Sequence, residues 1–162
     1  MISAMRTTVL GLLLAGLWQS AAFGQCAPAP DSPYFFRNLS EQRAEAKIAV
    51  NAAVFEQQLS DTFLSRGADG KPLNKRDYIA VELAARPAIP GRRFYSINNY
   101  TLLEHRKGYT VASYVLIEGV TGNGAPQLVE SQLREVYEVV DGKWRLASVE
   151  TAPAAPPTTA VN

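Results

Sequence analysis

The sequence predicts an α+β fold, with helices laid on one face of a mostly antiparallel sheet. Two observations carry this prediction. Residues 40–59 and 74–87 show helical hydrophobic patterns, and residues 94–150 show strand patterns whose separating turns contain glycine. Helices followed by a run of antiparallel strands are typical of α+β domains. The length of 162 residues, with 47% hydrophobic and 19% charged residues, fits one globular domain with tails.

The first helical pattern predicts one long amphipathic helix. Ser40 suits the N-cap, and Glu41 places an acid in the first turn, where the helix dipole favours it. Apolar residues then recur every three or four positions from Ala44 to Phe63. The helix is therefore expected to begin at Glu41 and to end at about Leu59.

A shorter second helix is predicted after an extended segment and a turn. Residues 61–65 are expected to be extended, and the sequence GADGKP at 67–72 is expected to form the turn. Asn74 then caps the second helix, and Asp77, three residues later, completes a capping-box-like pair. Pro87 ends this helix, because proline cannot continue it.

The rest of the chain predicts antiparallel strands joined by turns. Their ranges are 94–98, 100–105, 109–118, 128–140 and 144–150. The strand 109–118 is apolar on both faces, with Val115 and Ile117 on one face and Tyr114 and Leu116 on the other. One face is expected to meet the helices. The other is expected either to meet a second subunit or to be covered by the protein's own loops.

Residues 1–24 have the pattern of a secretory signal peptide. Arg6 supplies the positive start, an apolar run of ten residues follows, and Ala22 and Gly24 form a small-residue cleavage site before Gln25. The run is shorter than the roughly 20 residues that cross a bilayer. We expect cleavage near Gly24–Gln25 and a secreted, periplasmic mature protein. An uncleaved anchor is the alternative.

The segments that flank the predicted domain are rich in proline and alanine. Residues 25–37 are expected to form a disordered lead-in and residues 152–162 a disordered tail, which leaves residues 38–151 as the folded domain. Loss of residues 1–24 removes one arginine and no acid, so the mature chain carries equal numbers of basic and acidic residues. A neutral chain argues against nucleic acid and anionic membranes as partners.

The counts of cysteine and histidine limit the chemistry. With one Cys (Cys26) and one His (His105), the chain can form neither a disulfide framework nor a metal site of several thiolates or imidazoles. The sequence also contains no G-x-S-x-G, P-loop or G-x-G-x-x-G motif. No metal or cofactor is therefore expected.

The order of these elements, together with the closing hairpin, resembles a known family. The long helix is followed by Asp61-Thr-Phe, the turn Gly67-Ala-Asp-Gly-Lys and Lys75-Arg-Asp-Tyr-Ile, and the chain closes with VYEVVDGKWRLASVET at 136–151. This pattern resembles the nuclear transport factor 2-like superfamily, specifically its SnoaL-like branch (domain of unknown function 4440). The resemblance covers roughly residues 38–151.

The resemblance implies a cone, in which a strongly curved sheet wraps around a long helix and leaves an apolar pocket at the open end. It also implies a dimer formed through the sheet. Relatives include steroid isomerases, polyketide cyclases, dehydratases and binding or assembly modules, so the fold does not define the activity. The expected lining of the pocket is Phe55, Leu59, Phe63, Tyr78, Tyr95, Tyr114, Tyr137 and Trp144. For each of these residues, filling the core is the alternative.

A catalytic version of such a pocket needs a carboxylate base and a nearby hydroxyl donor. The candidate carboxylates are Asp61, Glu118, Glu130, Glu135 and Glu138, with Tyr114 and Tyr137 as donors. Asp61 equally suits a cap or turn, while Glu118 and Glu138, near strand ends, suit a solvated position.

Two basic side chains are weaker candidates. Arg134 could bind an anionic ligand, although a surface ion pair is the commoner arrangement on a sheet. His105 stands beside the tight turn Arg106-Lys107-Gly108 and is expected to be exposed at a hairpin tip. Relatives that use an Asp–His pair have the histidine inside the cavity, so this departure argues against transferring that mechanism.

The leading hypothesis is a secreted domain that binds a small apolar or amphipathic molecule and forms a homodimer. One alternative is a cofactor-independent isomerase, cyclase or dehydratase with a buried carboxylate base and a tyrosine donor. Another is a dimeric interaction module without activity. A carboxylate inside the cavity and near a tyrosine hydroxyl favours the enzyme, whereas a cavity lined only by aromatic and aliphatic side chains excludes it.

Overall fold

The computed structural model describes residues 32–67, 69–84, 91–122 and 125–152. The predicted signal peptide, residues 25–31 of the predicted lead-in and residues 153–162 of the predicted tail lie outside this part of the chain. The elements are α1 (Pro33–Ala49), α2 (Ala52–Gln58), β1 (Leu59–Arg66), β2 (Pro72–Asn74), α3 (Lys75–Ala84), β3 (Arg92–Arg106), β4 (Tyr109–Thr121), β5 (Gln127–Val140) and β6 (Lys143–Ala152). None of the described helices is long and apolar enough to cross a membrane.

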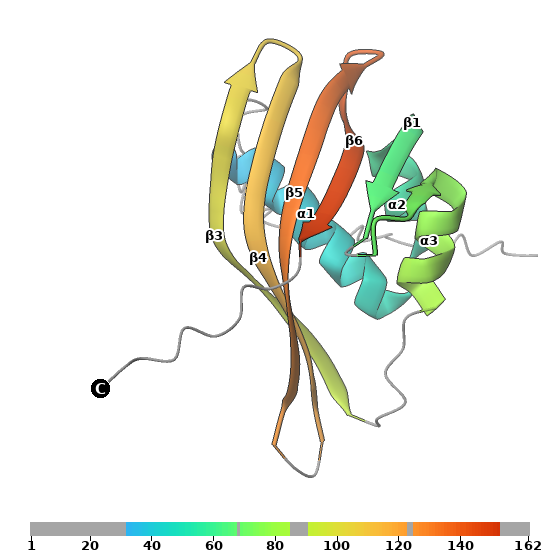
Figure 1. Cartoon of the computed structure of the whole chain (residues 1–162), viewed down its shortest axis with the longest axis vertical. Helices are drawn as coiled ribbons and strands as arrows, with labels where there is room; N and C mark the ends of the chain where they lie inside the picture. Colours follow the sequence, from blue (N-terminus) through green and yellow to red (C-terminus); the bar gives the residue numbers. More distant parts are fainter. Residues whose placement is uncertain (1–31, 68, 85–90, 123–124, 153–162) are drawn as a thin grey trace, which may run out of the picture.

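The strands form one sheet in the order β2-β1-β6-β5-β4-β3. Neighbouring strands are antiparallel, except that β1 and β6 are parallel. The sheet curves around α1, while α2 and α3 lie at the edge formed by β1 and β2 (Figure 1). This curved sheet packed on N-terminal helices confirms the predicted α+β cone.

The start of α1 packs against the sheet through aromatic side chains. Phe36, near the start of α1, is fully buried, and its ring centroid lies 5.1 Å from that of Tyr137 and 5.0 Å from that of Trp144. Tilted and edge-on pairs of this kind add to the stabilisation that burial of apolar area supplies. The open space of the cone is consequently found beside the later turns of α1.

Helix α1 begins about two turns before the predicted start. Ser32 is the N-cap: its Oγ accepts a hydrogen bond from the Phe35 N–H at 3.2 Å, and Pro33 occupies the first position, where no N–H is required. The prediction that Ser40 caps this helix was wrong, because Ser40 lies inside α1 and is buried. Residues 33–37 of the predicted lead-in are therefore helical.

The single helix predicted from the apolar pattern is in fact two helices. Val50 adopts a left-handed backbone conformation with φ 57°, and the Asn51 N–H donates to the Ala46 carbonyl at 2.8 Å, which ends α1. The Asn51 side-chain oxygen then accepts from the Ala53 N–H at 3.1 Å and caps α2. The apolar spacing continues across this break, so periodicity alone does not reveal it.

The strands agree with the predictions except at two places. Segments 94–98 and 100–105 form one strand, β3, which carries an irregularity at Asn99, where φ is 53°. The predicted extended segment 61–65 lies within β1, whereas the three-residue strand β2 was not predicted. Short edge strands of this kind lack enough residues to show an alternating pattern.

The predicted cap of α3 and the predicted closing turn are both present. The Asp77 N–H donates to the Asn74 side-chain oxygen at 3.0 Å, which confirms the capping interaction. At the β5–β6 turn, Asp141 and Gly142 have φ values of 52° and 72°. Two consecutive left-handed residues are what a type I′ hairpin turn requires, and an Asp-Gly pair favours that turn.

Candidate functional site

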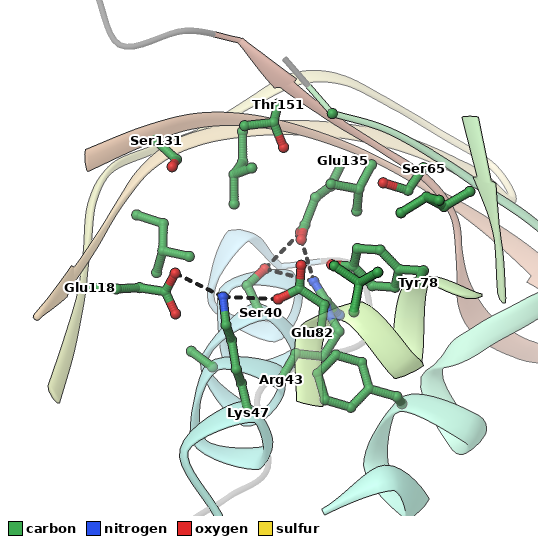
Figure 2. A pocket seen from close by; sticks show the side chains of 18 of the residues that line it. Ser40, Arg43, Lys47, Ser65, Tyr78, Glu82, Glu118, Ser131, Glu135 and Thr151 are labelled. Atoms are coloured by element: carbon green, nitrogen blue, oxygen red, sulfur yellow. Dashed lines mark hydrogen bonds and ion pairs between the residues drawn. The ribbon is translucent and has the colours of Figure 1, made fainter. Parts of the chain in front are cut away.

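A cavity of about 500 Å³ lies between the concave face of the sheet and helices α1 and α3 (Figure 2). Its apolar walls are Ala44, Phe55, Leu73, Val81, Leu116, Leu133 and Val149. A volume in this range and a mostly apolar lining with a few polar groups are typical of small-molecule sites. Two clusters stand out among the polar lining groups, one buried at the floor of the cavity and one partly exposed at its mouth. The remaining polar lining residues are Ser65, Asp69, Lys71, Tyr78, Ser131 and Thr151.

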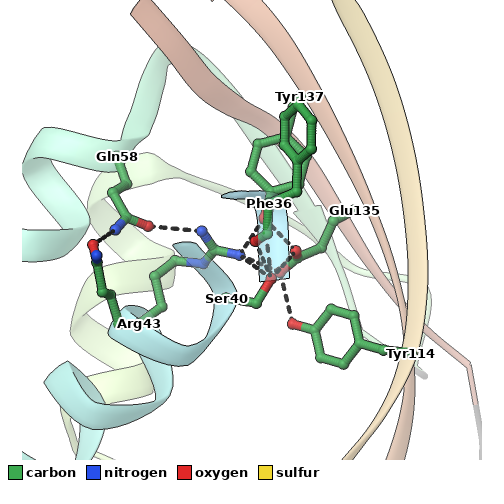
Figure 3. A network of polar contacts seen from close by, with 8 residues as sticks. Phe36, Ser40, Arg43, Gln58, Tyr114, Glu135 and Tyr137 are labelled. Carbon is green, nitrogen blue, oxygen red and sulfur yellow. Dashed lines mark hydrogen bonds and ion pairs between the residues drawn. The ribbon is translucent and has the colours of Figure 1, made fainter. Parts of the chain in front are cut away.

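The buried cluster, called here the floor network, consists of Ser40, Arg43, Tyr114, Glu135 and Tyr137 (Figure 3). Ser40 and Arg43 lie one turn apart on α1, and Glu135 and Tyr137 are two residues apart on β5, so each pair shares one face of its element. Arg43 is 5% exposed and Glu135 is 2% exposed. Both charges are therefore removed from solvent.

All the acceptor positions of Glu135 are occupied by donors of the protein itself. Its Oε1 accepts from the Arg43 guanidinium and from the Tyr114 hydroxyl, the latter at 2.8 Å. Its Oε2 accepts from the Tyr137 hydroxyl at 2.6 Å and from the Ser40 hydroxyl at 2.8 Å. A carboxylate offers about four acceptor sites, so Glu135 has none left for a ligand.

Arg43 connects the floor network to both N-terminal helices. Its Nη2 donates to the Tyr137 hydroxyl at 2.8 Å, and its Nη1 donates to the Gln58 side-chain oxygen at 2.7 Å. Gln58, the last residue of α2, in turn donates to the Gln42 side-chain oxygen at 2.8 Å. The network thus ties α1 and α2 to β5.

The ionisation of the floor network follows from these contacts. Burial alone would raise the pKa of Glu135, but the positive charge of Arg43 and the hydrogen bonds from Tyr137 and Tyr114 outweigh burial and lower this pKa. Burial raises the pKa of both tyrosines well above the usual value, so they stay protonated donors. A general base works best with a pKa near the operating pH, and Glu135 lacks this property.

The partly exposed cluster, called here the mouth triad, consists of Lys47 of α1, Glu82 of α3 and Glu118 of β4 (Figure 2). The Lys47 Nζ lies 2.9 Å from Glu82 Oε2 and 2.8 Å from Glu118 Oε2, and the three side chains are 18%, 24% and 31% exposed. Burial would lower the pKa of Lys47, but the two carboxylates reverse this effect and raise it. One ammonium group therefore serves two carboxylates.

A second cavity of about 420 Å³ shares Lys47 and Glu118 with the first. Its apolar lining includes Ile48, Phe94, Val120 and Val129. Gly119 lies directly under the Phe94 ring, where an added Cβ would come within 2.4 Å of a ring carbon. Glycine at this position therefore allows the Phe94 ring to approach β4 closely.

Three of the eight residues predicted to line the pocket do line the larger cavity: Phe55, Tyr78 and Tyr114. Tyr137 is fully buried behind the lining, and it joins the floor network through its hydroxyl and through its ring, whose centroid lies 5.6 Å from the Arg43 guanidinium carbon. The other four residues, Leu59, Phe63, Tyr95 and Trp144, lie elsewhere. Leu59 and Phe63 belong to the core, Trp144 packs on Phe36, and the Tyr95 hydroxyl donates to Glu45 at 3.0 Å.

Of the five candidate carboxylates, too, some line the cavity and the others lie outside it. Glu135 and Glu118 line the cavity, whereas Glu130 and Glu138 are exposed outside it. The Asp61 carboxylate is fully exposed and lies 3.4 Å from Lys75 Nζ. A ligand at the cavity can therefore reach only the first two of these carboxylates.

The basic candidates lie outside the cavity. Arg134 pairs with Glu150 at 3.3 Å on the exposed sheet surface. His105 is exposed, as predicted, with its Nδ1 2.8 Å from the Thr110 hydroxyl. Among the described residues, no group of three His, Cys, Asp or Glu side chains is placed to hold a metal ion.

The sequence-based reasoning missed the most important polar residues of the cavity. The helical pattern favours Ser40 as a cap and singles out neither Arg43 nor Lys47. Their spacing of three and four residues nevertheless places all three on one face of α1, next to Ala44. Polar residues at helical spacing beside an apolar residue are therefore the pattern in the sequence that could have indicated a cavity with both polar and apolar lining.

Neither a family model nor a curated protein matches the sequence. Solved structures do match the fold. An NTF2-like protein of unknown function from Pseudomonas putida is 14% identical, with a TM-score of 0.65 over 81% of this chain and 92% of that chain. A nuclear transport factor 2 (NTF2-like) superfamily protein from Salmonella enterica is 10% identical, with a TM-score of 0.63 over 80% and 96% of the two chains.

A third similar structure is the CaMKII hub homology domain of Chlamydomonas reinhardtii, which is 17% identical, with a TM-score of 0.63 over 74% of this chain and 96% of that chain. At these identities the likeness concerns the fold and not the activity. The curved six-stranded sheet, the helices on its concave side and these structural neighbours together show that the chain has the nuclear transport factor 2-like fold.

Proposed function

We propose that the larger cavity binds a small amphipathic molecule and does not transform it. The observation that carries this proposal is the combination of apolar walls around about 500 Å³ with a carboxylate, Glu135, whose acceptor sites are filled by the protein's own donors. The walls offer apolar contact to the body of a ligand. The partly exposed polar side chains at the mouth orient its polar end.

The enzymatic alternative has one observation in its favour, since Glu135 lies inside the cavity with the Tyr114 hydroxyl at 2.8 Å. This is the pairing of carboxylate and donor that an isomerase or cyclase needs. The ion pair with Arg43, however, lowers the pKa of Glu135. Its oxygens would have to lose an existing hydrogen bond before accepting a substrate proton. Binding without turnover is therefore the better account of the site.

We also propose three properties that accompany this function. The signal-peptide pattern of residues 1–24 supports export to the periplasm. The half-buried apolar residues Val115 and Ile117, on the face of β4 opposite Leu116, support a homodimer formed through the sheet. The closing hairpin at 136–151 supports membership of the SnoaL-like branch. Light scattering of the mature protein tests the dimer, and a monomer at micromolar concentration contradicts it.

The binding proposal is tested with an uncharged probe, naphthalen-2-ylmethanol, which carries an apolar body and one hydroxyl. We expect it to raise the melting temperature of the protein, because a ligand that binds only the folded state stabilises it by about 2.7 kcal/mol at 100 times its Kd. Native mass spectrometry of the purified protein then checks for a ligand that co-purifies. No thermal shift and no bound mass would contradict the proposal.

A matched pair of variants locates the binding. Leu116→Trp places a large ring in the cavity and is expected to abolish the thermal shift. Leu103→Trp, at a position that is 60% exposed on β3, is expected to leave it unchanged. Equal shifts in both variants would place the probe outside the cavity.

A further inference from the structure

The charges around the larger cavity do not balance. Of the residues that the structure describes, seven charged ones line it: three cations, Arg43, Lys47 and Lys71, and four carboxylates, Asp69, Glu82, Glu118 and Glu135. Each cation already has a carboxylate partner among the described residues. Within the described part of the lining, an anionic ligand would therefore find no unpaired cation and would meet a net negative charge.

The surplus negative charge is located at the mouth triad. Arg43 and Glu135 neutralise each other in the floor network, and Lys71 faces Asp69 at 3.9 Å. Among the described cations, only Lys47 pairs with Glu82 and Glu118, through one oxygen, Oε2, of each. Among the described side chains, none donates a hydrogen bond to Oε1 of Glu82 or Glu118. These two oxygens remain able to accept from an N–H donor.

Apolar side chains continue directly from these carboxylates into the cavity. Leu116 lies two residues before Glu118 on the same face of β4, and Val81 precedes Glu82 on α3; both apolar residues line the cavity. A cationic group held between Glu82 and Glu118 would therefore place an attached apolar body against Leu116 and towards Phe55.

We propose that the cavity takes an amphipathic cation, namely a primary or secondary ammonium group carried on an apolar body. This inference rests on the proposed binding function and names the chemical class of its ligand. The ammonium group donates to Glu82 and Glu118 at the mouth, beside Lys47. Charge-assisted hydrogen bonds to partly buried carboxylates are stronger than those between neutral groups, so the charge of the ligand gives it preference over a neutral analogue.

Three probes that share one apolar body test this class: naphthalen-2-ylmethylamine, naphthalen-2-ylmethanol and 2-naphthoate. Calorimetric titration of the purified protein at pH 7 is expected to show the amine binding about tenfold more tightly than the alcohol, which corresponds to about 1.4 kcal/mol. The carboxylate is expected to bind most weakly, because it meets the surplus negative charge. If the alcohol binds as tightly as the amine, or if the naphthoate binds best, the inference fails while the binding function stands.

Charge-neutral variants separate a role of the triad in recognition from a structural role. Glu82→Gln and Glu118→Gln are each expected to reduce the preference for the amine over the alcohol by at least about threefold. Lys47→Met removes the competing cation and is expected to increase this preference. Glu138→Gln, an exposed carboxylate on β5 outside the cavity, is the control and is expected to change neither affinity.

Opposite effects of the Glu→Gln and Lys→Met variants are a signature that simple loss of stability does not produce. Equal preference in all four variants and the parent protein would overturn the assignment of the ammonium group to Glu82 and Glu118. Binding of none of the three probes by the parent protein would instead overturn the proposed binding function, and the inference with it.

Discussion

The floor network and the mouth triad are both ion clusters anchored on α1, and their cations, Arg43 and Lys47, lie one turn apart. They differ in burial and in the number of carboxylates that each cation pairs with. Glu135 is 2% exposed and has four donors, whereas Glu82 and Glu118 are 24% and 31% exposed and share one ammonium group. Glu135 of the first cluster has no acceptor site left, whereas Glu82 and Glu118 each keep one oxygen that no described side chain donates to.

This difference separates a structural role from a binding role within one cavity. A buried charge that loses its partner is left in a medium that solvates it poorly, so the pair must stay together. A partly exposed charge keeps contact with water and can exchange partners at little cost. Among groups of like chemistry, those with unused donors or acceptors and access to solvent are the ones available to a ligand.

The largest expected effect comes from breaking the buried pair. Arg43→Met is expected to reduce the free energy of unfolding by about 3–5 kcal/mol, because Glu135 would remain buried without its cation. Urea denaturation followed by circular dichroism measures this change. The control, Arg134→Met, removes a partner of Glu150 from an exposed pair and is expected to cost less than about 1 kcal/mol. Similar losses in both variants would contradict the distinction between the two kinds of pair.

The pH dependence of stability is the next effect. The pKa of Glu135 is lowered in the folded protein from a usual value of 4.5, so at acidic pH the unfolded chain binds more protons at this site. The stabilisation by ionised Glu135 is therefore complete above the unfolded pKa and is lost as the pH falls through the folded pKa. Unfolding free energies measured between pH 7 and pH 3 are expected to show this fall.

Glu135→Gln isolates this contribution, since glutamine does not titrate. The variant is expected to be less stable at pH 7 and to lose less stability than the parent protein on acidification. In Arg43→Met the pKa of Glu135 is expected to be raised and not lowered, because burial then acts without the opposing effect of the cation. That variant should then lose less of its stability, or gain some, as the pH falls. Parallel curves for all three proteins would exclude Glu135 as a source of the pH dependence.

The fold could be predicted from the sequence, because its signals are local. Asn74 and Asp77 form the expected cap, and the Asp141–Gly142 pair forms the expected turn. The alternation of side chains along the chain predicts most of the strands of the sheet. The start of α1 was missed because Ser32-Pro33 lay inside a proline-rich segment that was assigned to disorder. The break at Val50 has no apolar signal, since the hydrophobic spacing continues across it.

The site was harder to predict, because it depends on pairs that are distant in the sequence. Arg43 and Glu135 are 92 residues apart, and Lys47 and Glu118 are 71 apart. In the sequence, Glu135 is one of four candidate carboxylates on predicted strands, beside Asp61 after the first helix, and its contact with α1 is what distinguishes it. Aromatic side chains such as Tyr95 and Trp144 carry no sign of whether they face a cavity, a core or the surface. Periodicity assigns a residue to a face but does not say what that face meets.

A smaller effect is expected from removing one donor of the floor network. Tyr114→Phe deletes the hydroxyl that donates to Glu135 at 2.8 Å and is expected to cost about 1.5–3 kcal/mol, the usual range for a hydrogen bond to a charged group. Tyr78→Phe is the control, since its hydroxyl makes no hydrogen bond to another described residue, and it is expected to cost about 0.5 kcal/mol or less. Equal costs, measured by urea denaturation, would mean that the Tyr114 hydroxyl does not support Glu135.

The smallest effect is expected at the mouth triad, and salt distinguishes it from the floor network. Lys47→Met leaves Glu82 and Glu118 to repel each other, but partial exposure limits the cost to about 1 kcal/mol. Because the Debye length shrinks to about 3 Å at 1 M salt, most of this cost should disappear in 1 M NaCl. The cost of Arg43→Met should persist there, since the buried pair is shielded from counterions. If high salt reduces both costs alike, the two clusters do not differ in solvent access, and the separation of a structural floor from a binding mouth is wrong.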